Sequence, residues 1–387
     1  MIPIKYNVRN LRVRWATTLL AVLATGLVVW SSCVLFGFID GLQHSLDVSG
    51  DPLDLIVLRN GSTTDVNSGF EAAKADELAN LDGVARDANG SLLAAPEVVT
   101  IPIVERRDGS RANVTLRGVV PASRALRPAF TIVRGRDLEP GKGECLASVN
   151  LSRRFKGAGL GEEFRISSNE SYRVVGIFTA GGSAAESEIW ADIGDLRRNT
   201  GREGSVSCVQ FRAASAADRD RLRATIRDDE RFGLLAMDEV DYFQSQTESG
   251  AFLKAAGILI ALLLSIGAMF ASANTMFSAV KSRSREIGTM RALGFRGRDI
   301  LASFLSESLL LCLLGGALGL LATLPLSNLT FGTSNFSTFS EVTINFRFGP
   351  WVLGGALVMT AAMGLFGGLF PAVRAVRMNV IDALREV

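Results

Sequence analysis

The sequence predicts an α-helical membrane protein with four transmembrane helices and an α+β extracytoplasmic domain carried on a helical stalk. Three observations favour this class. Apolar residues are concentrated in four long stretches, a charged and turn-rich region separates the first two, and basic residues gather on one side of them. A mean hydropathy of +0.27 over 387 residues agrees with a chain that lies partly in lipid.

Each of the four apolar stretches is long enough to be a membrane span. A helix needs roughly 20 apolar residues to cross the hydrocarbon core of a bilayer. Stretches of about that length or longer occupy residues 16–38, 255–280, 300–326 and 350–373. We therefore expect the transmembrane helices within residues 1–38, 251–280, 300–328 and 350–373, with an external loop at residues 329–349.

The charge distribution predicts the orientation of the spans, because Lys and Arg near span ends are retained in the cytoplasm. The N-terminal segment, residues 281–299 and the tail at residues 374–387 together carry 13 basic and four acidic residues. Residues 39–250 carry 26 basic and 33 acidic residues. Both termini are therefore expected in the cytoplasm, and residues 39–250 outside the inner membrane. A nucleic-acid partner is not expected, since the chain has no basic footprint for one.

The region between the first two spans has the pattern of a folded domain on two helices. Residues 39–48 extend the first span until Gly50 and Pro52, and a polar helix at residues 238–251 leads into the second span. These two helices would form the stalk. Further elements follow from apolar periodicity and from the turn signal Asp108-Gly109: strands at 54–58, 97–105, 111–120, 144–149, 172–178, 205–213 and 234–240, and helices at 70–81 and 216–229.

The order of these elements predicts a domain in two parts. Residues 39–120 and 200–250 would form an α+β part together with the stalk helices. Residues 121–199 are rich in glycine turns and short strands, which predicts an inserted β-rich subdomain.

Several catalytic chemistries have no residues to support them. The only histidine is His44, so no histidine-based triad or multi-histidine metal site can form. The segment GRDLEPGKG at residues 135–143 departs from a phosphate-binding loop in its glycine spacing and in Gly143, where Ser or Thr would hold magnesium. Cys145 and Cys208 lie in the predicted external domain, where a disulfide is permitted but not established by two cysteines.

The segment between spans two and three combines basic residues with a helical pattern. If the second span continued as a helix, Lys281 and Arg285 would share one face, and Ile287 and Met290 another. Gly294 would end this helix. A loop that only sets topology, or a helix lying against anionic lipid, would also explain the bases. The ordered pattern of residues favours docking of a partner over both alternatives.

The segment REIGTMRALGF at residues 285–295 resembles the cytoplasmic signature of ABC-transporter permeases of the FtsX and MacB type, also called type VII or mechanotransmission permeases. The resemblance extends along nearly the whole chain. It includes NTMFSAV (274–280), SESLLL (306–311), GGALG (315–319), PAVRAVRMNVIDALRE (371–386), RGRDLEPGKGECLAS (134–148) and YRVVGIFTAGGSAAESEIW (172–190).

The resemblance implies a permease subunit that is not itself an enzyme. It would form a homodimer, or pair with a close paralogue, and a separate cytosolic ABC ATPase would bind the ATP and magnesium. MacB carries its ATPase at its N-terminus, whereas 15 residues precede the first span here, so no fused ATPase and no cofactor on this chain are expected. The external region would be a MacB-like periplasmic core domain with a porter-like part and an inserted part.

The resemblance places the coupling to the ATPase at residues 281–299. The expected coupling residues are Arg283, Arg285, Glu286, Ile287, Gly288, Met290, Arg291 and Gly294, and the expected secondary cytoplasmic contacts are Arg374, Arg377, Leu384 and Arg385.

Two further predictions concern residues inside the spans. Glu307 is the only ionisable residue well inside a span, and we expect it to form a structural ion pair with Arg291 or Arg298. Six glycines in spans three and four would pack either within one subunit or at a dimer seam.

The family supports more than one function. The leading expectation is export of a substrate with a periplasmic membrane-fusion adaptor. The alternatives are an FtsX-like scaffold that activates a cell-wall hydrolase, and a lipoprotein-release permease. A ligand-sensing receptor would need a cytosolic signalling module, which the sequence does not contain. The sequence leaves open the substrate, the adaptor and whether the dimer contains one kind of chain or two.

Overall fold

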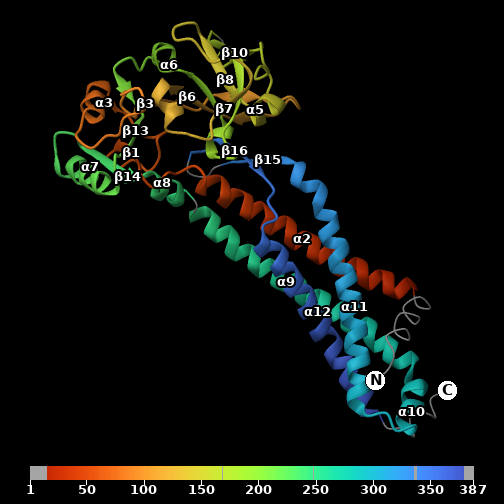
Figure 1. Ribbon diagram of the computed structural model, residues 1–387. Coiled ribbons are helices and arrows are strands. Elements are labelled where there is room, and N and C mark those ends of the chain that lie inside the picture. Colours follow the sequence, from red (N-terminus) through yellow and green to blue (C-terminus); the bar gives the residue numbers. More distant parts are fainter. Residues whose placement is uncertain (1–14, 168, 247, 335–337, 379–387) are drawn as a thin grey trace. The chain divides into compact units, whose positions relative to one another are not determined.

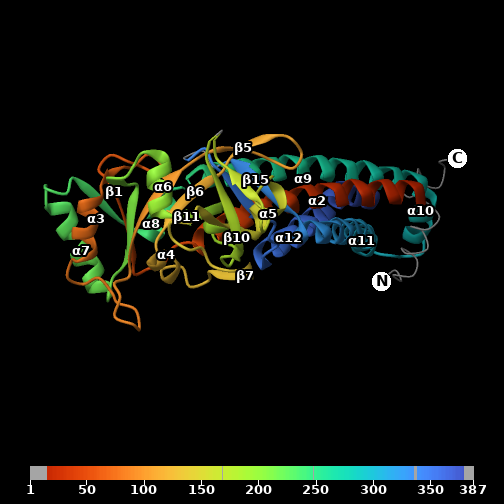
Figure 2. The same ribbon diagram turned by 90° about the horizontal axis from the view of Figure 1, so that it is seen from above.

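The computed structural model describes residues 15–167, 169–246, 248–334 and 338–378, and it divides into two compact units. The helical unit comprises residues 1–40, 251–329 and 346–387 (Figure 1). The sheet unit comprises residues 41–250 and 330–345 (Figure 2). The hairpin at residues 330–345 therefore belongs to the sheet unit, although the sequence places it between the third and fourth spans.

The helical unit contains the four predicted spans. Its elements are α2 (Trp15–Asp47, which continues into the sheet unit), α9 (Glu248–Ser282), α10 (Ser284–Ala292), α11 (Gly297–Thr323), the 3-10 turn η2 (Leu324–Asn328) and α12 (Pro350–Arg377). Among the described residues, α2, α9, α11 and α12 are long and apolar enough to cross a membrane. The four-span prediction is confirmed, as is the helical extension of the first span. The stalk stays a prediction.

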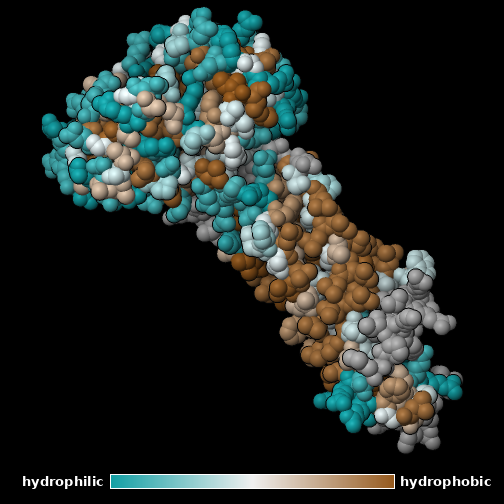
Figure 3. Space-filling model, in the orientation of Figure 1, coloured by the Kyte–Doolittle hydropathy of each residue, from teal (hydrophilic) through white to brown (hydrophobic). Residues whose placement is uncertain are grey.

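Apolar side chains cover much of the outer surface of the helical unit, as the brown areas of Figure 3 show. Exposed large apolar residues lie on every span, for example Leu20, Leu263, Leu321, Phe366 and Phe370. A soluble protein rarely exposes so continuous an apolar surface. The chain is therefore a membrane protein whose lipid-facing surface is formed by these helices.

The spans pack on each other through glycines. An added Cβ at Gly319 would lie 2.5 Å from the carbonyl oxygen of Gly26 on α2, and one at Gly364 would lie 2.9 Å from the Cα of Leu309 on α11. The other predicted glycines, Gly315, Gly316, Gly367 and Gly368, also meet helices of the same chain. These residues therefore pack within one subunit, and their small size lets the helix backbones approach.

Replacing Gly319 with alanine is expected to destabilise the helical unit by about 1–3 kcal/mol, because the obstructing Gly26 oxygen is backbone and cannot move aside. Gly267 on α9 has open space around the same position, so Gly267→Ala is the matched control and should be neutral or slightly stabilising. Thermal unfolding in lipid nanodiscs measures both. Equal unfolding temperatures for the two variants would contradict the close contact.

The sheet unit is built on one mixed sheet of ten strands. The strand order is β14-β1-β13-β3-β6-β11-β8-β10-β7, and β9 pairs with β10. These strands are β1 (Asp54–Arg59), β3 (Ala94–Thr100), β6 (Thr115–Val119), β7 (Thr131–Gly135), β8 (Glu144–Ser148), β9 (Glu163–Arg165), β10 (Ser171–Thr179), β11 (Glu188–Asp192), β13 (Cys208–Arg212) and β14 (Leu234–Asp238). Most of the predicted strands are confirmed, with shorter bounds at the hairpin. The sheet continues without a break through residues 121–199.

Helices cover the sheet at both ends of its strand order. They are α3 (Ala72–Ala79), α4 (Pro121–Ala125), α5 (Val149–Arg154), the 3-10 turn η1 (Ala184–Ser187), α6 (Ile193–Thr200), α7 (Ala216–Asp228) and α8 (Glu239–Ser245). Alternation along β1 sends Leu55 and Val57 into one apolar cluster with α3 and α7, and Ile56 and Leu58 into another with Tyr242 of α8. Both faces of this strand are therefore buried.

Three small strand pairs complete the sheet unit: β2 (Phe70–Glu71) with β12 (Ser205–Val206), β4 (Ile103–Glu105) with β5 (Arg111–Asn113), and β15 (Thr330–Ser334) with β16 (Glu341–Asn345). The last pair corrects the prediction of a loop at residues 329–349. Glu341 at the start of β16 is buried and forms ion pairs with Arg106 and Arg154. The backbone N–H of Thr343 donates to Ser187 Oγ at 2.7 Å, which fixes the hairpin on η1.

The two cysteines of the sheet unit are free thiols. Cys145 lies on β8 and Cys208 on β13, strands that are not neighbours in the sheet. Burial raises the pKa of both thiols. They therefore act as small apolar core residues, and the structure contains no disulfide between them.

Candidate partner-docking site at helix α10

Helix α10 is separated from α9 by a break at Arg283. This residue has φ −116° and ψ 14°, outside the α-helical region, and α9 ends one residue before it. The prediction that the second span continues as one helix through residue 293 is therefore wrong. At this break the Arg283 side chain is buried, whereas Arg285 beside it is exposed.

The buried Arg283 side chain contacts Glu307 on α11. Its Nη1 lies 2.9 Å from Glu307 Oε2 and its Nη2 lies 3.2 Å from Oε1, so the pair is bidentate. Both side chains are buried. Glu307 therefore has the predicted structural role, but with Arg283 in place of Arg291 or Arg298. Arg283, expected to be a coupling residue, is buried in this ion pair, and its role in coupling stays a prediction.

The face of α10 that packs against the spans is held by apolar contacts. Ile287 is 0 % exposed and packs with Met276, Ile300, Phe304 and Ala375, which come from α9, α11 and α12. Gly288 beside it is also buried. Both were expected to be coupling residues. Their burial places them in the support behind α10 and not on its exposed face, and their role in coupling stays a prediction.

Gly294 ends α10 as predicted. Its φ of +94° is accessible to glycine at little cost. The Gly294 N–H donates to Arg291 O and the Phe295 N–H donates to Met290 O, both at 3.1 Å, which is the paired pattern of a Schellman motif. The cap turns the chain sharply, and α11 begins at Gly297.

The C-terminal end of α12 is held beside α10. Arg291 Nη1 donates to the carbonyl oxygens of Val376 and Met378, so it caps the unsatisfied end of α12. The Arg374 guanidinium lies 5.7 Å from the ring centre of Phe277 on α9. Arg374 and Arg377 are exposed next to this end. The remaining expected contacts, Leu384 and Arg385, lie outside the described residues.

The exposed part of the segment combines bases with two large apolar residues. Arg285 and Glu286 are exposed, as is Gly294, while Met290 and Arg291 are half-buried. Leu293 is 75 % exposed and Phe295 is 39 % exposed. Sequence reasoning did not select these last two as contacts. The Schellman cap could have pointed to them, because it places the residues around Gly294 at the tip of the turn.

Two family models match this chain. One, described as a MacB-like periplasmic core domain, matches residues 18–229, which is more than half of the chain. The other, described as an FtsX-like permease C-terminal domain, matches residues 258–380. The chain belongs to the MacB/FtsX family of ABC transporter permeases.

Proteins named as macrolide export ATP-binding/permease proteins are similar to parts of this permease. It is 35 % identical over 150 residues to the macrolide export ATP-binding/permease protein MacB of Chromobacterium violaceum, an alignment that covers 38 % of this chain and 22 % of that protein. It is 40 % identical over 113 residues to MacB 1 of Aeromonas hydrophila, covering 29 % and 16 %. The aligned parts are therefore less than a quarter of each relative.

Solved structures of external domains also match the permease. The extracellular domain of the ABC-type transporter YknZ from Gram-positive bacteria has a TM-score of 0.37 at 16 % identity, covering 48 % of this chain and 99 % of that one. The periplasmic region of MacB from Actinobacillus actinomycetemcomitans has a TM-score of 0.39 at 11 % identity, covering 54 % and 98 %.

Proposed function

We propose that this permease subunit couples ATP hydrolysis by a separate cytosolic ABC ATPase to a conformational change of the sheet unit outside the inner membrane. The observation that carries this proposal is the α10 segment, which presents exposed basic and apolar residues on a rigidly supported backbone. A docking surface needs apolar anchors together with charges that set specificity. Leu293 and Phe295 are the anchors, and Arg285 is a predicted basic contact that is exposed on the same segment.

The support behind α10 makes it suited to transmit motion. Arg283 joins the break before α10 to α11, and Arg291 joins α10 to the end of α12. A displacement of α10 therefore acts on three spans, α9, α11 and α12, and not on a flexible loop alone. In this proposal ATP and magnesium bind only to the ATPase, and this chain supplies the mechanical path.

The charge distribution supports the orientation. The basic segments lie at the α10 end and at the C-terminal end of α12, while residues 39–250 are acidic overall. Both termini and α10 are thus in the cytoplasm, and the sheet unit is periplasmic.

We further propose that the permease forms a dimer, with a second copy of this chain or with a close paralogue. This dimer would export a substrate together with a periplasmic membrane-fusion adaptor.

The docking proposal is tested by purifying the tagged full chain from its native membranes and identifying co-purifying proteins that contain an ATP-binding ABC domain. Leu293→Asp should weaken retention of that ATPase at least about tenfold, since it removes a central apolar anchor. Arg285→Glu should weaken it less. Arg221→Glu on exposed α7 is the matched control and should change nothing. Retention of the ATPase by the Leu293→Asp/Arg285→Glu double variant would contradict docking at α10.

A further inference from the structure

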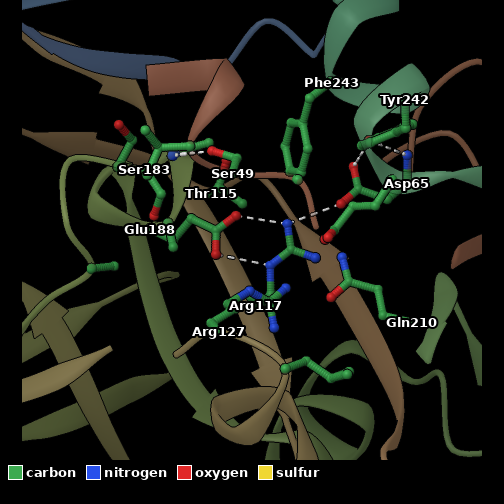
Figure 4. Close-up of a pocket in the computed structure, with 18 of the residues that line it drawn as sticks. Ser49, Asp65, Thr115, Arg117, Arg127, Ser183, Glu188, Gln210, Tyr242 and Phe243 are labelled. Carbon is green, nitrogen blue, oxygen red and sulfur yellow. Dashed lines mark hydrogen bonds and ion pairs between the residues drawn. The ribbon is translucent and has the colours of Figure 1, made fainter. Parts of the chain in front are cut away.

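The sheet unit contains a pocket that the proposed coupling does not use. Its volume is about 270 Å³, near the lower end of small-molecule sites, which span about 300–1,000 Å³. Segments far apart in the sequence line it: the turn that follows α2, β6, the loop after α4, η1, β13, α8, and β16 with the loop before it. Figure 4 shows Arg117 of β6 in its middle, with Phe243 and Tyr242 of α8 on one side.

The two arginines of the pocket are already neutralised by carboxylates. Arg117 donates from Nε and Nη2 to Glu188, from Nη2 to Asp65 at 2.9 Å and from Nη1 to Glu97 at 2.9 Å. Arg127 donates to both oxygens of Glu97 and lies over the Trp190 ring. Neither guanidinium therefore has its charge free to attract an anion.

The carboxylates around the pocket outnumber these arginines. Asp65, Glu97, Glu188 and Glu239 lie in or directly behind its wall, against Arg117 and Arg127. Glu239 is 5 % exposed, and the hydrogen bond that its side chain accepts comes from the backbone N–H of Asp51 at 3.1 Å. Near neutral pH Glu239 is largely protonated, so Asp65, Glu97 and Glu188 exceed the two arginines by one charge, and Glu239 adds to this excess as it ionises. The local balance therefore favours a cationic ligand over an anion.

An independent observation also points to a hydrogen-bond donor. Gln210 on β13 is 4 % exposed and lines the pocket, and its Oε1 has no hydrogen-bond partner among the described residues. Figure 4 shows its amide directed toward Arg117 in the middle of the pocket. A buried acceptor without a donor costs about 1–3 kcal/mol, which a bound N–H group would recover.

The remaining wall is apolar. Phe243, Leu126 and Val342 line it, as does Phe130, whose ring stacks on Trp190 with centres 4.8 Å apart. We propose that this pocket binds a small organic cation that carries N–H donors on an apolar body. The cationic group would face Gln210 Oε1 and the Glu239 carboxylate, and the apolar body would lie against the phenylalanines.

The protonation of Glu239 gives the site a pH dependence. Burial raises the pKa of Glu239 to about 8, with Asp54 and Glu97 acting in the same direction and Arg127 opposing them, and Arg212 is a further charge nearby. A bound cation favours the ionised carboxylate. Affinity for a cation whose own charge is constant should therefore rise, by roughly tenfold, as pH increases from 6 to 9.

The test uses the full chain in nanodiscs without ATPase or nucleotide, so its result is independent of the proposed coupling. Binding of benzamidinium, which stays cationic over this pH range, is measured by saturation-transfer NMR against empty nanodiscs. Benzamide and benzoate are the neutral and anionic controls of the same shape. Benzamidinium should bind, benzoate should not, and benzamide should bind more weakly.

Substitutions in the pocket test whether benzamidinium binds there. Gln210→Met removes the orphan acceptor at similar size and should weaken benzamidinium several-fold without lowering thermal stability. Glu239→Gln should remove the rise of affinity with pH. Asp108→Asn, in an exposed turn outside the pocket, is the control. Binding that survives the Gln210→Met/Glu239→Gln double variant, equal binding of all three probes, or no binding of benzamidinium would each overturn the proposal.

Discussion

Replacing Glu307 with alanine is expected to destabilise the helical unit by about 3–5 kcal/mol. The variant leaves the buried Arg283 guanidinium without its bidentate partner, and an uncompensated buried charge is far more costly than the loss of a surface ion pair. The measurement is the midpoint of thermal unfolding of the full chain in nanodiscs. Retention of an ABC ATPase should fall in parallel, because α10 starts immediately after Arg283.

A double variant separates the missing charge from the missing packing. Arg283→Met with Glu307→Leu removes both charges and keeps apolar volume at both positions, so it should recover most of the lost stability. The surface residues of α10 are unchanged in it. Wild-type stability of Glu307→Ala alone would mean that Arg283 reaches water, and would contradict the buried ion pair.

Replacing Arg117 with methionine is expected to destabilise the sheet unit at neutral pH by about 3–5 kcal/mol. Asp65, Glu97 and Glu188 would then remain buried with one of their two cations removed. Hydrogen exchange of β6 and its neighbours β3 and β11 measures the loss locally. Arg231→Met is the matched control, since that side chain is 83 % exposed, and should leave the exchange unchanged.

The pH dependence of this variant should be opposite to that of the wild-type protein. In the wild type, burial alone would raise the pKa of Glu97, but Arg127 and Arg117 outweigh it and lower the pKa from 4.5 to about 2. That stabilisation is present above pH 4.5 and is lost as pH falls toward 2. Without Arg117 the carboxylates take up protons more readily, so the deficit should shrink between pH 7 and pH 5. A deficit that grows over this range would contradict the charge network.

Local patterns were sufficient to predict most elements. The spans follow from apolar length, and the strands and helices of the sheet unit follow from periodicity, because each element contains its own signal over a few consecutive residues. The end of α10 is equally local, since Gly294 alone determines where the helix can turn. The family could be inferred from sequence for a similar reason: each of the segments that carry the resemblance is contiguous.

The errors concern contacts between distant residues. Arg283, at the break, pairs with Glu307, 24 residues away, and a helical projection cannot reveal a partner on another span. The burial of Ile287 depends on four helices meeting at one place. Residues 330–345 are rich in Ser and Thr, so they resemble a loop, and the residues that Glu341 and Thr343 contact, Arg106, Arg154 and Ser187, lie far away in the sequence.

The hairpin β15–β16 has a topological consequence for the whole chain. Because it belongs to the sheet unit, the polypeptide passes between the two units four times, at residues 40–41, 250–251, 329–330 and 345–346. A single insert between two spans would give only two such passages. The ends of α11 and α12 are thus bonded through a few residues to a structure anchored by Glu341. Each of the four spans consequently has its own covalent connection to the sheet unit.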